Sequence, residues 1–265
     1  MTAIDRAARS LLWRLNTSVH KPVYAYVARR ARDDVLFLNW AYEEDPPMDL
    51  PLDPSDEPSR YPIQLYHASA TQNGGLASKR ILEVGCGHGG GASYLTRTLR
   101  PESYVGLDLN AAGIEFCRRR HQLPGLEFIE GNAENLPFPS ESFDAVLNVE
   151  SSHLYPHFDR FLSEVARVLR PGGTFLYTDM RQSFQCEEWE KDLNGMGMRM
   201  LSGREINVEV LRGMDLNNAH WEGVWDRLAP RFVRLVAHAP TKDSPMYRDT
   251  VSGKQSYRMY CLTKS

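Results

Sequence analysis

Residues 80–91 read Arg-Ile-Leu-Glu-Val-Gly-Cys-Gly-His-Gly-Gly-Gly, and this stretch decides the fold. Its first five residues are mostly apolar and predict a short buried strand. Gly85, Gly87 and Gly89 then predict a tight turn, because glycine lets the backbone approach a ligand closely. A helix is expected from about Gly90, so that backbone N–H groups at its N-terminus point at that ligand. The stretch therefore predicts a nucleotide-type site at the carboxyl end of a strand.

The carboxyl group of Glu83 distinguishes two kinds of nucleotide site. Gly85, Gly87 and Gly90 also match G-x-G-x-x-G, the fingerprint of dinucleotide-binding proteins. A dinucleotide places its pyrophosphate at the helix N-terminus, where a neighbouring carboxylate repels it. Glu83 instead suits a cationic part of a ligand, such as an amino group or a sulfonium. The alternative is a strand glutamate that only caps a nearby backbone amide.

Two further segments extend this site. Residues 104–108 predict a second strand that ends in Asp108, and a carboxylate at that position can accept both hydroxyls of a ribose. Residues 131–138 form a polar loop directly after a third expected strand, at 126–130. In this loop the Asn132 side chain and a backbone N–H can read the edge of an adenine. Sites for nicotinamide dinucleotides use the same acidic residue, so Asp108 alone leaves both kinds of cofactor open.

With these three features, residues 78–180 resemble the class I S-adenosylmethionine-dependent methyltransferases. The resemblance rests on Glu-Val-Gly-Cys-Gly-x-Gly in the turn and on Asn-Ala-Glu-Asn-Leu-Pro-Phe in the later loop. It implies S-adenosyl-L-methionine as the cofactor and transfer of its methyl group. The family usually has Asp where this chain has Asn132, whose carbonyl can still accept a hydrogen bond from the adenine amino group. By position, the resemblance assigns the methionyl part to Glu83, Gly85, Gly87 and Gly89, the ribose to Asp108, and the adenine to Leu109, Asn132 and Ala133, with Asn148 as a further cofactor-binding residue.

A narrower resemblance rests on Asn39–Pro47, Gly87–Arg97 and Ser256–Cys261. These segments are similar to the mycobacterial lipid O-methyltransferases, a group that acts on phthiotriolone dimycocerosates and on glycopeptidolipids. The resemblance covers nearly the whole chain and implies a hydroxyl acceptor on a cell-envelope lipid or glycolipid. A glycopeptidolipid sugar or a fatty-acyl hydroxyl is the preferred interpretation, and phthiotriolone dimycocerosate is the alternative.

Composition limits the class of protein. The chain has 265 residues, which suits one large domain with appendages. Its net charge of −3 argues against nucleic acid as a partner. The four cysteines are scattered without a C-x-x-C pair, so we expect a reducing compartment and no metal signature. Because no apolar run has transmembrane length and no signal-peptide pattern is present, we expect a cytoplasmic protein.

An alternation of strands and helices begins at residue 80. We expect strands near 80–84, 104–108, 126–130, 144–149 and 174–178, a last strand at Ser256–Thr263, and the clearest helix at 158–169. Such alternation predicts an α/β, Rossmann-like, doubly wound fold with a mainly parallel sheet, and the resemblance implies seven strands. We divide the chain into an N-terminal helical and strap region (1–77), a cofactor-binding core (78–183), a helical lid insert over the acceptor site (184–245) and a C-terminal strand that completes the sheet (246–265).

Three segments outside the core have unusual compositions. Residues 1–32 carry seven Lys and Arg side chains and one acid. They predict either a basic amphipathic helix in peripheral contact with the inner face of a membrane or a helix that covers the active site. Residues 43–58, with seven acids and five prolines, predict an extended strap. The insert contains several Met and Trp residues, which suit an apolar acceptor and equally suit the core of a helical cap.

Methyl transfer to an alcohol needs a general base, because the hydroxyl loses its proton in the transition state. His153 follows the expected strand 144–149, and Asp179 follows the strand 174–178. If these strands are neighbours, their carboxyl ends share one edge of the sheet, and Asp179 can orient the His153 imidazole. Glu150 is the alternative base. The competing interpretations are a loop histidine that only shapes the pocket and an aspartate that caps a helix.

Other residues stay open as candidates. His67, His157 and His220 are outside candidates for the base. Trp40 and Tyr42, in the N-terminal strap, either close over the cofactor or simply pack.

Two rival classes of protein remain at this stage. The first is a nicotinamide-dependent oxidoreductase, against which Glu83 and the polar loop argue. The second is a non-enzymatic cofactor-binding scaffold, which needs no base in the crevice. A metal held by Asp179 and His153 has no cluster of acids to support it, so we expect no metal.

Overall fold

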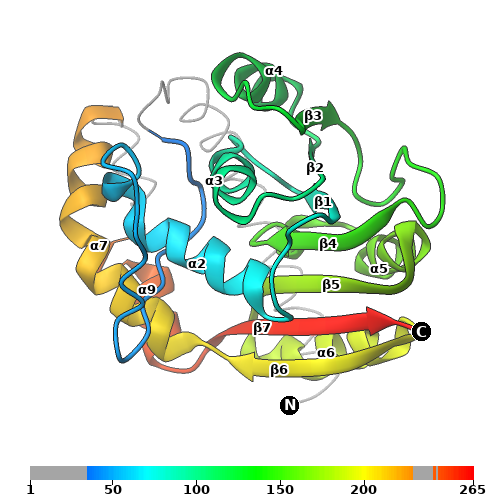
Figure 1. The fold of residues 1–265 in the computed structure, drawn as a ribbon. Coiled ribbons are helices and arrows are strands. Elements are labelled where there is room, and N and C mark those ends of the chain that lie inside the picture. Colours follow the sequence, from blue (N-terminus) through cyan, green and yellow to red (C-terminus); the bar gives the residue numbers. More distant parts are fainter. Residues whose placement is uncertain (1–34, 229–240, 243) are drawn as a thin grey trace.

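The computed structural model describes residues 35–228, 241–242 and 244–265, and these residues form a sheet covered by helices on both faces (Figure 1). The strands are β1 (Arg80–Val84), β2 (Ser103–Asp108), β3 (Leu126–Glu130), β4 (Phe143–Val149), β5 (Leu169–Gln182), β6 (Met198–Glu205) and β7 (Gln255–Lys264). They form one seven-stranded sheet in the order β3-β2-β1-β4-β5-β7-β6. The first five strands of that order run parallel, and β7 runs antiparallel to both of its neighbours.

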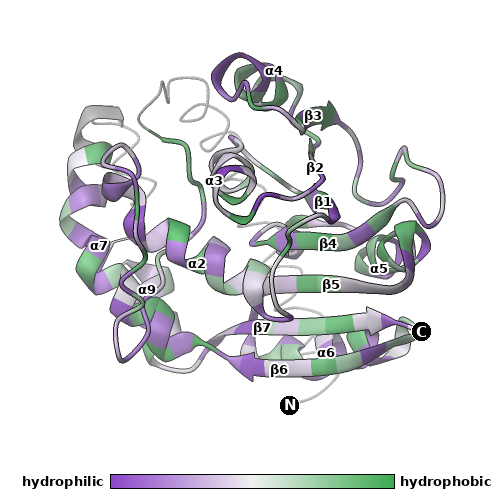
Figure 2. Ribbon diagram, viewed as in Figure 1, coloured by the Kyte–Doolittle hydropathy of each residue, from purple (hydrophilic) through white to green (hydrophobic). Residues whose placement is uncertain are grey.

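The helices separate into two layers. They are α2 (Arg60–Thr71), α3 (Gly90–Leu99), α4 (Ala111–Arg120), α5 (Phe158–Val168), α6 (Cys186–Gly195), α7 (Asn207–Leu228) and α9 (Pro245–Val251). Side chains of α2, α3, α4 and α7 share one hydrophobic core with one face of the sheet. Side chains of α5 and α6 share a second core with the other face. Figure 2 shows hydrophobic stretches along β4, β5 and β7 beneath these helices. The doubly wound α/β fold is confirmed.

The switch from α5 to β5 has a local cause. Phe161, Leu162 and Val165 are buried at helical spacing, which explains why this segment forms an amphipathic helix. Leu169 has extended backbone angles and pairs with Phe143, so the strand begins directly where the helix ends. Residues 170–173 interrupt the register between β4 and β5, and Gly172 has a φ of 75° there. The Pro-Gly-Gly sequence therefore lies in an irregular start of β5 rather than in a separate loop.

The lid insert differs from its expectation. The sequence predicted a helical segment at residues 184–245, but Met198–Glu205 forms β6, an additional strand at the edge of the sheet. The sequence pattern does not reveal this strand, because seven of its eight residues are half-buried or exposed and only Met198 is buried. β5 is also longer than expected, and it continues past residue 178 to Gln182. The boundaries of the other three regions remain predictions.

The N-terminal strap, which in the structure comprises residues 35–56, lies across the ends of several elements. Tyr42 donates its backbone N–H to the carbonyl of Tyr61 in α2, and Glu43 donates to the carbonyl of Glu209 in α7. The expected membrane-contacting segment, residues 1–32, lies outside the described residues. Among the described residues, no helix is both long enough and apolar enough to span a membrane.

Candidate functional site

The glycine turn connects β1 to α3 and is hydrogen-bonded to the end of β2. Gly85 has a φ of 82°, and an added Cβ there would lie 2.2 Å from the Ser151 hydroxyl oxygen, so only glycine fits. The backbone N–H groups of Gly85 and Cys86 donate to the carbonyl of Leu107, at distances of 2.7 and 3.1 Å. Gly89 has a φ of 74° and is the N-cap of α3. The predicted turn from strand to helix is therefore present.

Asp108 ends β2 beside this turn. Its two carboxylate oxygens accept hydrogen bonds of 2.9 Å from the backbone N–H groups of Gly87 and Asn110. Burial raises the pKa of this carboxyl, and the backbone hydrogen bonds oppose the rise. Each oxygen keeps a second lone pair, so the group can also accept hydroxyl hydrogens. The neighbouring Leu109 side chain is 72% exposed, which leaves a flat apolar surface next to the carboxylate.

The loop after β3 starts at the same place. Gly131 donates its backbone N–H to the carbonyl of Asp108 at 3.0 Å, which brings the loop against the end of β2. Asn132 is exposed, and its side-chain oxygen accepts the N–H of Glu134 at 2.9 Å. Ala133 is buried beneath it. The turn, Asp108, Leu109 and this loop thus lie together, as the sequence predicted.

Glu83 has partners in the interior instead of facing an open site. Its carboxyl group is fully buried and accepts hydrogen bonds from the hydroxyls of Tyr66 and Tyr104, at 2.9 and 2.8 Å. Burial raises its pKa to about 7, although both phenol hydrogen bonds oppose the rise. This geometry differs from the expected contact with a cationic ligand. No sequence pattern indicated the bond to Tyr66, because that residue comes from α2, outside the glycine motif.

Asn148 also has interior partners. Its side-chain nitrogen donates to the carbonyl of Val84 and to the hydroxyl of Ser151, each at 2.7 Å. The side chain is fully buried, so it ties β4 to the last residue of β1. The sequence predicted direct contact between Asn148 and the cofactor. These hydrogen bonds favour a structural role for the side chain instead.

His153 and Asp179 lie together at the carboxyl ends of β4 and β5. The ring atom Nδ1 of His153 is 2.8 Å from Asp179 Oδ1, and the backbone N–H of His153 donates to Asp179 Oδ2 at 3.1 Å. The His153 side chain is 13% exposed, and Asp179 is fully buried. No hydrogen bond joins the other ring nitrogen, Nε2, to any described residue. The pair therefore has the arrangement of an oriented histidine base, with one nitrogen held and the other free.

Asp179 is held by further donors that the sequence did not indicate. Ser152 donates its hydroxyl to Asp179 Oδ2 at 2.6 Å, and Arg181 lies 3.4 Å from the same oxygen. Burial alone raises the pKa of Asp179, but His153, Arg181 and the hydrogen bonds outweigh it and hold that pKa well below the usual range. Residues i and i+2 of a strand share a face, so Asp179 and Arg181 could have been paired from sequence if β5 had been extended.

Glu150, the alternative base, is bound to the strap. Its Oε1 accepts the backbone N–H of Trp40 at 2.7 Å, and its φ of 50° is unusual for a residue with a side chain. Burial raises its pKa to about 8. Trp40 and Tyr42 are themselves buried. Of the two interpretations, closing over the cofactor or simply packing, the structure favours packing.

Comparison with known proteins decides the family. Residues 82–177 match the family model described as a methyltransferase domain. A fatty-acid O-methyltransferase of Mycolicibacterium smegmatis is 55% identical over 269 residues, covering 99% of this chain and 97% of that protein. Phthiotriol/phenolphthiotriol dimycocerosates methyltransferase 1 of Mycobacterium ulcerans is 56% identical over 263 residues, covering 97% of this chain and 96% of that protein. The chain belongs to the class I S-adenosylmethionine-dependent methyltransferases.

Solved structures share the fold of this methyltransferase. Geranyl diphosphate methyltransferase in complex with SAM has a TM-score of 0.62 at 15% identity, covering 87% of this chain and 100% of that chain. The [4+2]-cyclase SpnF has a TM-score of 0.63 at 22% identity, covering 86% of this chain and 87% of that chain. These likenesses concern the fold alone, since the second protein is named for a different reaction.

The cofactor of the methyltransferase is S-adenosyl-L-methionine. The exposed Leu109 beside the half-buried Asp108 fits a nucleoside, because it offers an apolar surface next to a hydroxyl acceptor. The positive-φ glycine turn fits a ligand that approaches the backbone closely. Family membership excludes the nicotinamide-dependent interpretation of the same glycines. Among the described residues, no group of three or more His, Cys, Asp or Glu side chains could hold a metal ion.

The remaining histidine candidates have other partners. His67 Nδ1 lies 2.9 Å from the hydroxyl of Tyr94, and His157 Nδ1 lies 2.9 Å from Glu134 Oε2 at the surface. His220 packs beside the ring of Trp221 on α7. The geometry therefore favours His153 over all three.

The Met and Trp residues of the insert mostly belong to the core. Trp189, Met198 and Met214 are at least 93% buried and pack in the two hydrophobic cores. These three residues therefore belong to the hydrophobic core, and they do not form an apolar surface for an acceptor.

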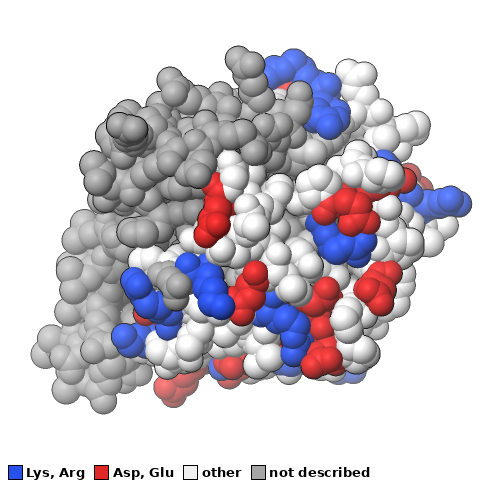
Figure 3. All heavy atoms as spheres, turned by 90° about the vertical axis from the view of Figure 1, so that its left-hand side faces the viewer, with Lys and Arg blue, Asp and Glu red and all other residues white. Residues whose placement is uncertain are grey.

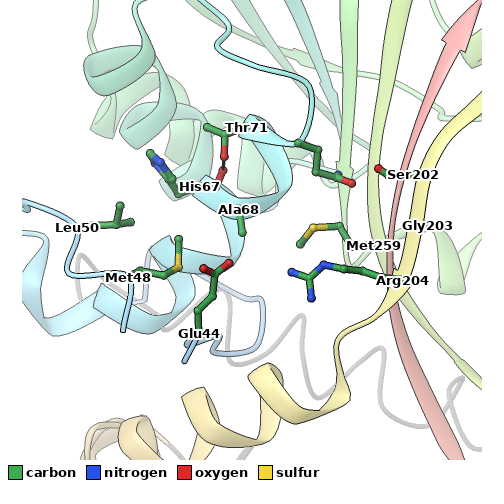
Figure 4. A pocket seen from close by; sticks show the side chains of 11 residues that line it. Glu44, Met48, Leu50, His67, Ala68, Thr71, Ser202, Gly203, Arg204 and Met259 are labelled. Atoms are coloured by element: carbon green, nitrogen blue, oxygen red, sulfur yellow. Dashed lines mark hydrogen bonds between the residues drawn. The ribbon is translucent and has the colours of Figure 1, made fainter. Parts of the chain in front are cut away.

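A hollow of about 680 Å³ lies between α2, the strap and the β6–β7 edge (Figure 4). Met48, Leu50 and Met259 form apolar parts of its wall, while Glu44 and Arg204 both bond the hydroxyl of Tyr42. Neither His153 nor Asp108 lines it. Its charged groups are thus neutralised within the methyltransferase, and we assign it no part in the transfer.

Proposed function

We propose that this methyltransferase transfers a methyl group to a hydroxyl of a cell-envelope lipid or glycolipid, with His153 as the general base. The observation that carries the proposal is the 2.8 Å contact between His153 Nδ1 and the ionised Asp179, which leaves Nε2 available. S-adenosyl-L-methionine supplies an electrophilic methyl group. The acceptor oxygen forms a bond to that methyl carbon as the carbon–sulfur bond breaks, and the hydroxyl proton passes to His153 Nε2.

The type of acceptor separates two proposals. Relatives of almost equal identity, 55% and 56%, are named for a fatty acid and for phthiotriol dimycocerosates. Identity therefore does not select an acceptor. A carboxylic acid is ionised at neutral pH and needs no base, whereas an alcohol does. The oriented His153–Asp179 pair supports the alcohol, and methyl-ester formation on a fatty acid is the second candidate function.

Asp108, Leu109, Asn132 and Ala133 are proposed to hold the ribose and adenine of the cofactor. The contact between Gly131 and Asp108 supports this assignment, because it brings the two segments to one edge. Gly85, Gly87 and Gly89 are proposed to hold the methionyl part through their backbone. Glu83 is proposed to act beneath them as a support for the turn.

The described part of the face in Figure 3 gives no support for nucleic acid as a partner. On the face in Figure 3, acidic and basic side chains of the described residues are interspersed, without a continuous basic stripe. Nucleic-acid sites usually concentrate Lys and Arg on one face. A peripheral membrane contact through residues 1–32 remains a proposal from sequence alone.

The test is methylation of three acceptors with a labelled methyl donor. Wild-type protein and His153→Ala are incubated separately with a phthiotriol dimycocerosate, a glycopeptidolipid and a long-chain fatty acid, and the methylated atom is located by mass spectrometry. We expect wild-type methyl transfer to a hydroxyl and a loss of about a hundredfold or more in His153→Ala. Exclusive formation of a fatty-acid methyl ester, unchanged in the variant, would establish the second candidate instead.

A further inference from the structure

Arg181 places a charge in the interior next to the proposed base. Its side chain is only 9% exposed, and Nη1 lies 3.4 Å from Asp179 Oδ2. The guanidinium carbon lies 5.1 Å from the ring centre of Phe158 and 4.7 Å from that of Trp189. Two aromatic faces attract a cation and restrict where it can move. A buried charge is costly unless it is paired, so this guanidinium and the Asp179 carboxylate depend on each other.

Ser152 connects the two charges through its hydroxyl. Arg181 Nη2 donates to the Ser152 oxygen at 2.9 Å, and that hydroxyl donates onward to Asp179 Oδ2 at 2.6 Å. The Asp179 Oδ1 atom faces the His153 ring and also accepts the backbone N–H of Met180 at 2.8 Å. Oδ2 is therefore directed to the Arg181 side and Oδ1 to the histidine ring. Rotation of the carboxylate would break contacts on both sides.

We propose that Arg181 is a positioning residue, which keeps the Asp179 carboxylate ionised and turned toward His153. The inference rests on the proposed function, in which His153 takes the proton of the acceptor hydroxyl. With Arg181 present, its positive charge balances Asp179 before the ring is protonated. The positive charge therefore opposes early proton uptake by the His153–Asp179 pair and leaves the imidazole ready to act as a base.

Several other titratable groups surround the His153–Asp179 pair and Arg181. They are Glu150, Tyr155, Tyr177, Tyr257 and Asp192, with Arg258 opposite Asp179 on β7. Burial raises the pKa of Glu150 to about 8, so it stays mostly neutral below that pH. A measurement must therefore read the histidine ring itself rather than the sum of all groups.

The experiment is a titration of the His153 ring by NMR in protein without acceptor, using wild type, Arg181→Met, Arg181→Gln and Arg181→Lys. In the two neutral variants we expect the midpoint of proton uptake by the pair to rise by about one pH unit or more. Arg181→Lys keeps the positive charge, so its midpoint of proton uptake should equal that of the wild type. Arg258→Met is the matched control, since it removes a nearby cation whose partner is Glu190, and its midpoint should not move.

Unchanged midpoints in the neutral variants, or an equal shift in Arg258→Met, would overturn the proposal. A second readout needs no variant: in the folded wild type the Asp179 carboxyl carbon should keep the chemical shift of an ionised carboxylate from about pH 8 to about pH 4. A proton taken up by that carboxyl above pH 4 would contradict the proposal even if every Arg181 variant failed to fold. Because neither measurement uses an acceptor, both remain decisive if hydroxyl methylation itself is not found.

Discussion

The backbone N–H of Trp40 donates a hydrogen bond of 2.7 Å to Glu150 Oε1, although 110 positions separate the two residues in the chain. This bond ties the strap to the carboxyl end of β4. Earlier in the strap, the Leu36 carbonyl would lie 2.5 Å from a Cβ added at Gly90, the first residue of α3. The strap therefore runs from the N-terminus of α3 to the end of β4, along the edge where the glycine turn lies.

Glu150→Gln should change how stability depends on pH. The folded pKa of Glu150, about 8, lies above the ordinary value of 4.5 for a glutamate, so the folded chain binds the proton more tightly than the unfolded chain. Stability from this group is complete below about pH 4.5 and is lost as the pH rises to about 8, with a slope of up to about 1.4 kcal/mol per pH unit. Gln keeps an acceptor for Trp40 and does not titrate. In thermal unfolding, the stability of the variant relative to the wild type should increase from about pH 6 to about pH 9.

Glu115→Gln is the control for that experiment, because Glu115 is 71% exposed and pairs with Arg119 on the surface of α4. Its difference from wild type should stay small across the same range. Parallel unfolding curves for Glu150→Gln and wild type at every pH would show that the carboxyl is not neutral in the folded protein.

Tyr104→Phe should destabilise the fold more at high pH than at low pH. The hydroxyl of Tyr104 donates to Glu83 Oε2 at 2.8 Å and favours the ionised carboxyl, whose pKa is about 7. Removing the donor should cost about 1–3 kcal/mol once Glu83 ionises, and less when it is protonated. Urea unfolding at about pH 5.5 and about pH 8.5 measures the difference. Tyr247→Phe, whose hydroxyl bonds the exposed Asp215, should show a small and constant effect; a larger loss at low pH for Tyr104→Phe would contradict the reasoning.

Asp108→Ala should weaken binding of S-adenosyl-L-methionine by about 1.5–3 kcal/mol, because the carboxylate is proposed to accept the ribose hydroxyls. Calorimetry measures the affinity. Glu130→Ala provides a matched control, since Glu130 pairs with Asp108 in the β2–β3 register but is exposed. Equal affinities in the two variants would remove the ribose role from Asp108.

His153→Ala and Asp179→Asn should lower turnover without adding to each other. The two side chains act as one unit through their 2.8 Å contact, so the double variant should be little slower than His153→Ala alone. Cofactor affinity should change little, because the ring is proposed to contact the acceptor. His157→Ala, which loses only a surface contact with Glu134, should retain near wild-type turnover. Multiplicative losses in the double variant would mean that the residues act separately.

Local pattern was sufficient for the core of the fold. The apolar residues of β1 and the glycines after it specify strand, turn and helix within a dozen neighbouring positions, and the structure has all three there. The pairing of His153 with Asp179 also followed from sequence, because the carboxyl ends of neighbouring parallel strands must meet at one edge.

Tertiary contacts decided what the pattern left open. Glu83 accepts a hydrogen bond from Tyr66 of α2. Asp179 pairs with Arg181 in the part of β5 that lies beyond the predicted end of the strand. The edge strand β6 has one buried residue, so its side chains carry almost no alternating signal, and only pairing with β7 reveals it. Sequence periodicity reports which way a side chain faces within its own element. Which charged group it then meets depends on the packing of distant elements, and that packing sets the proton affinity of Glu83, Glu150 and Asp179.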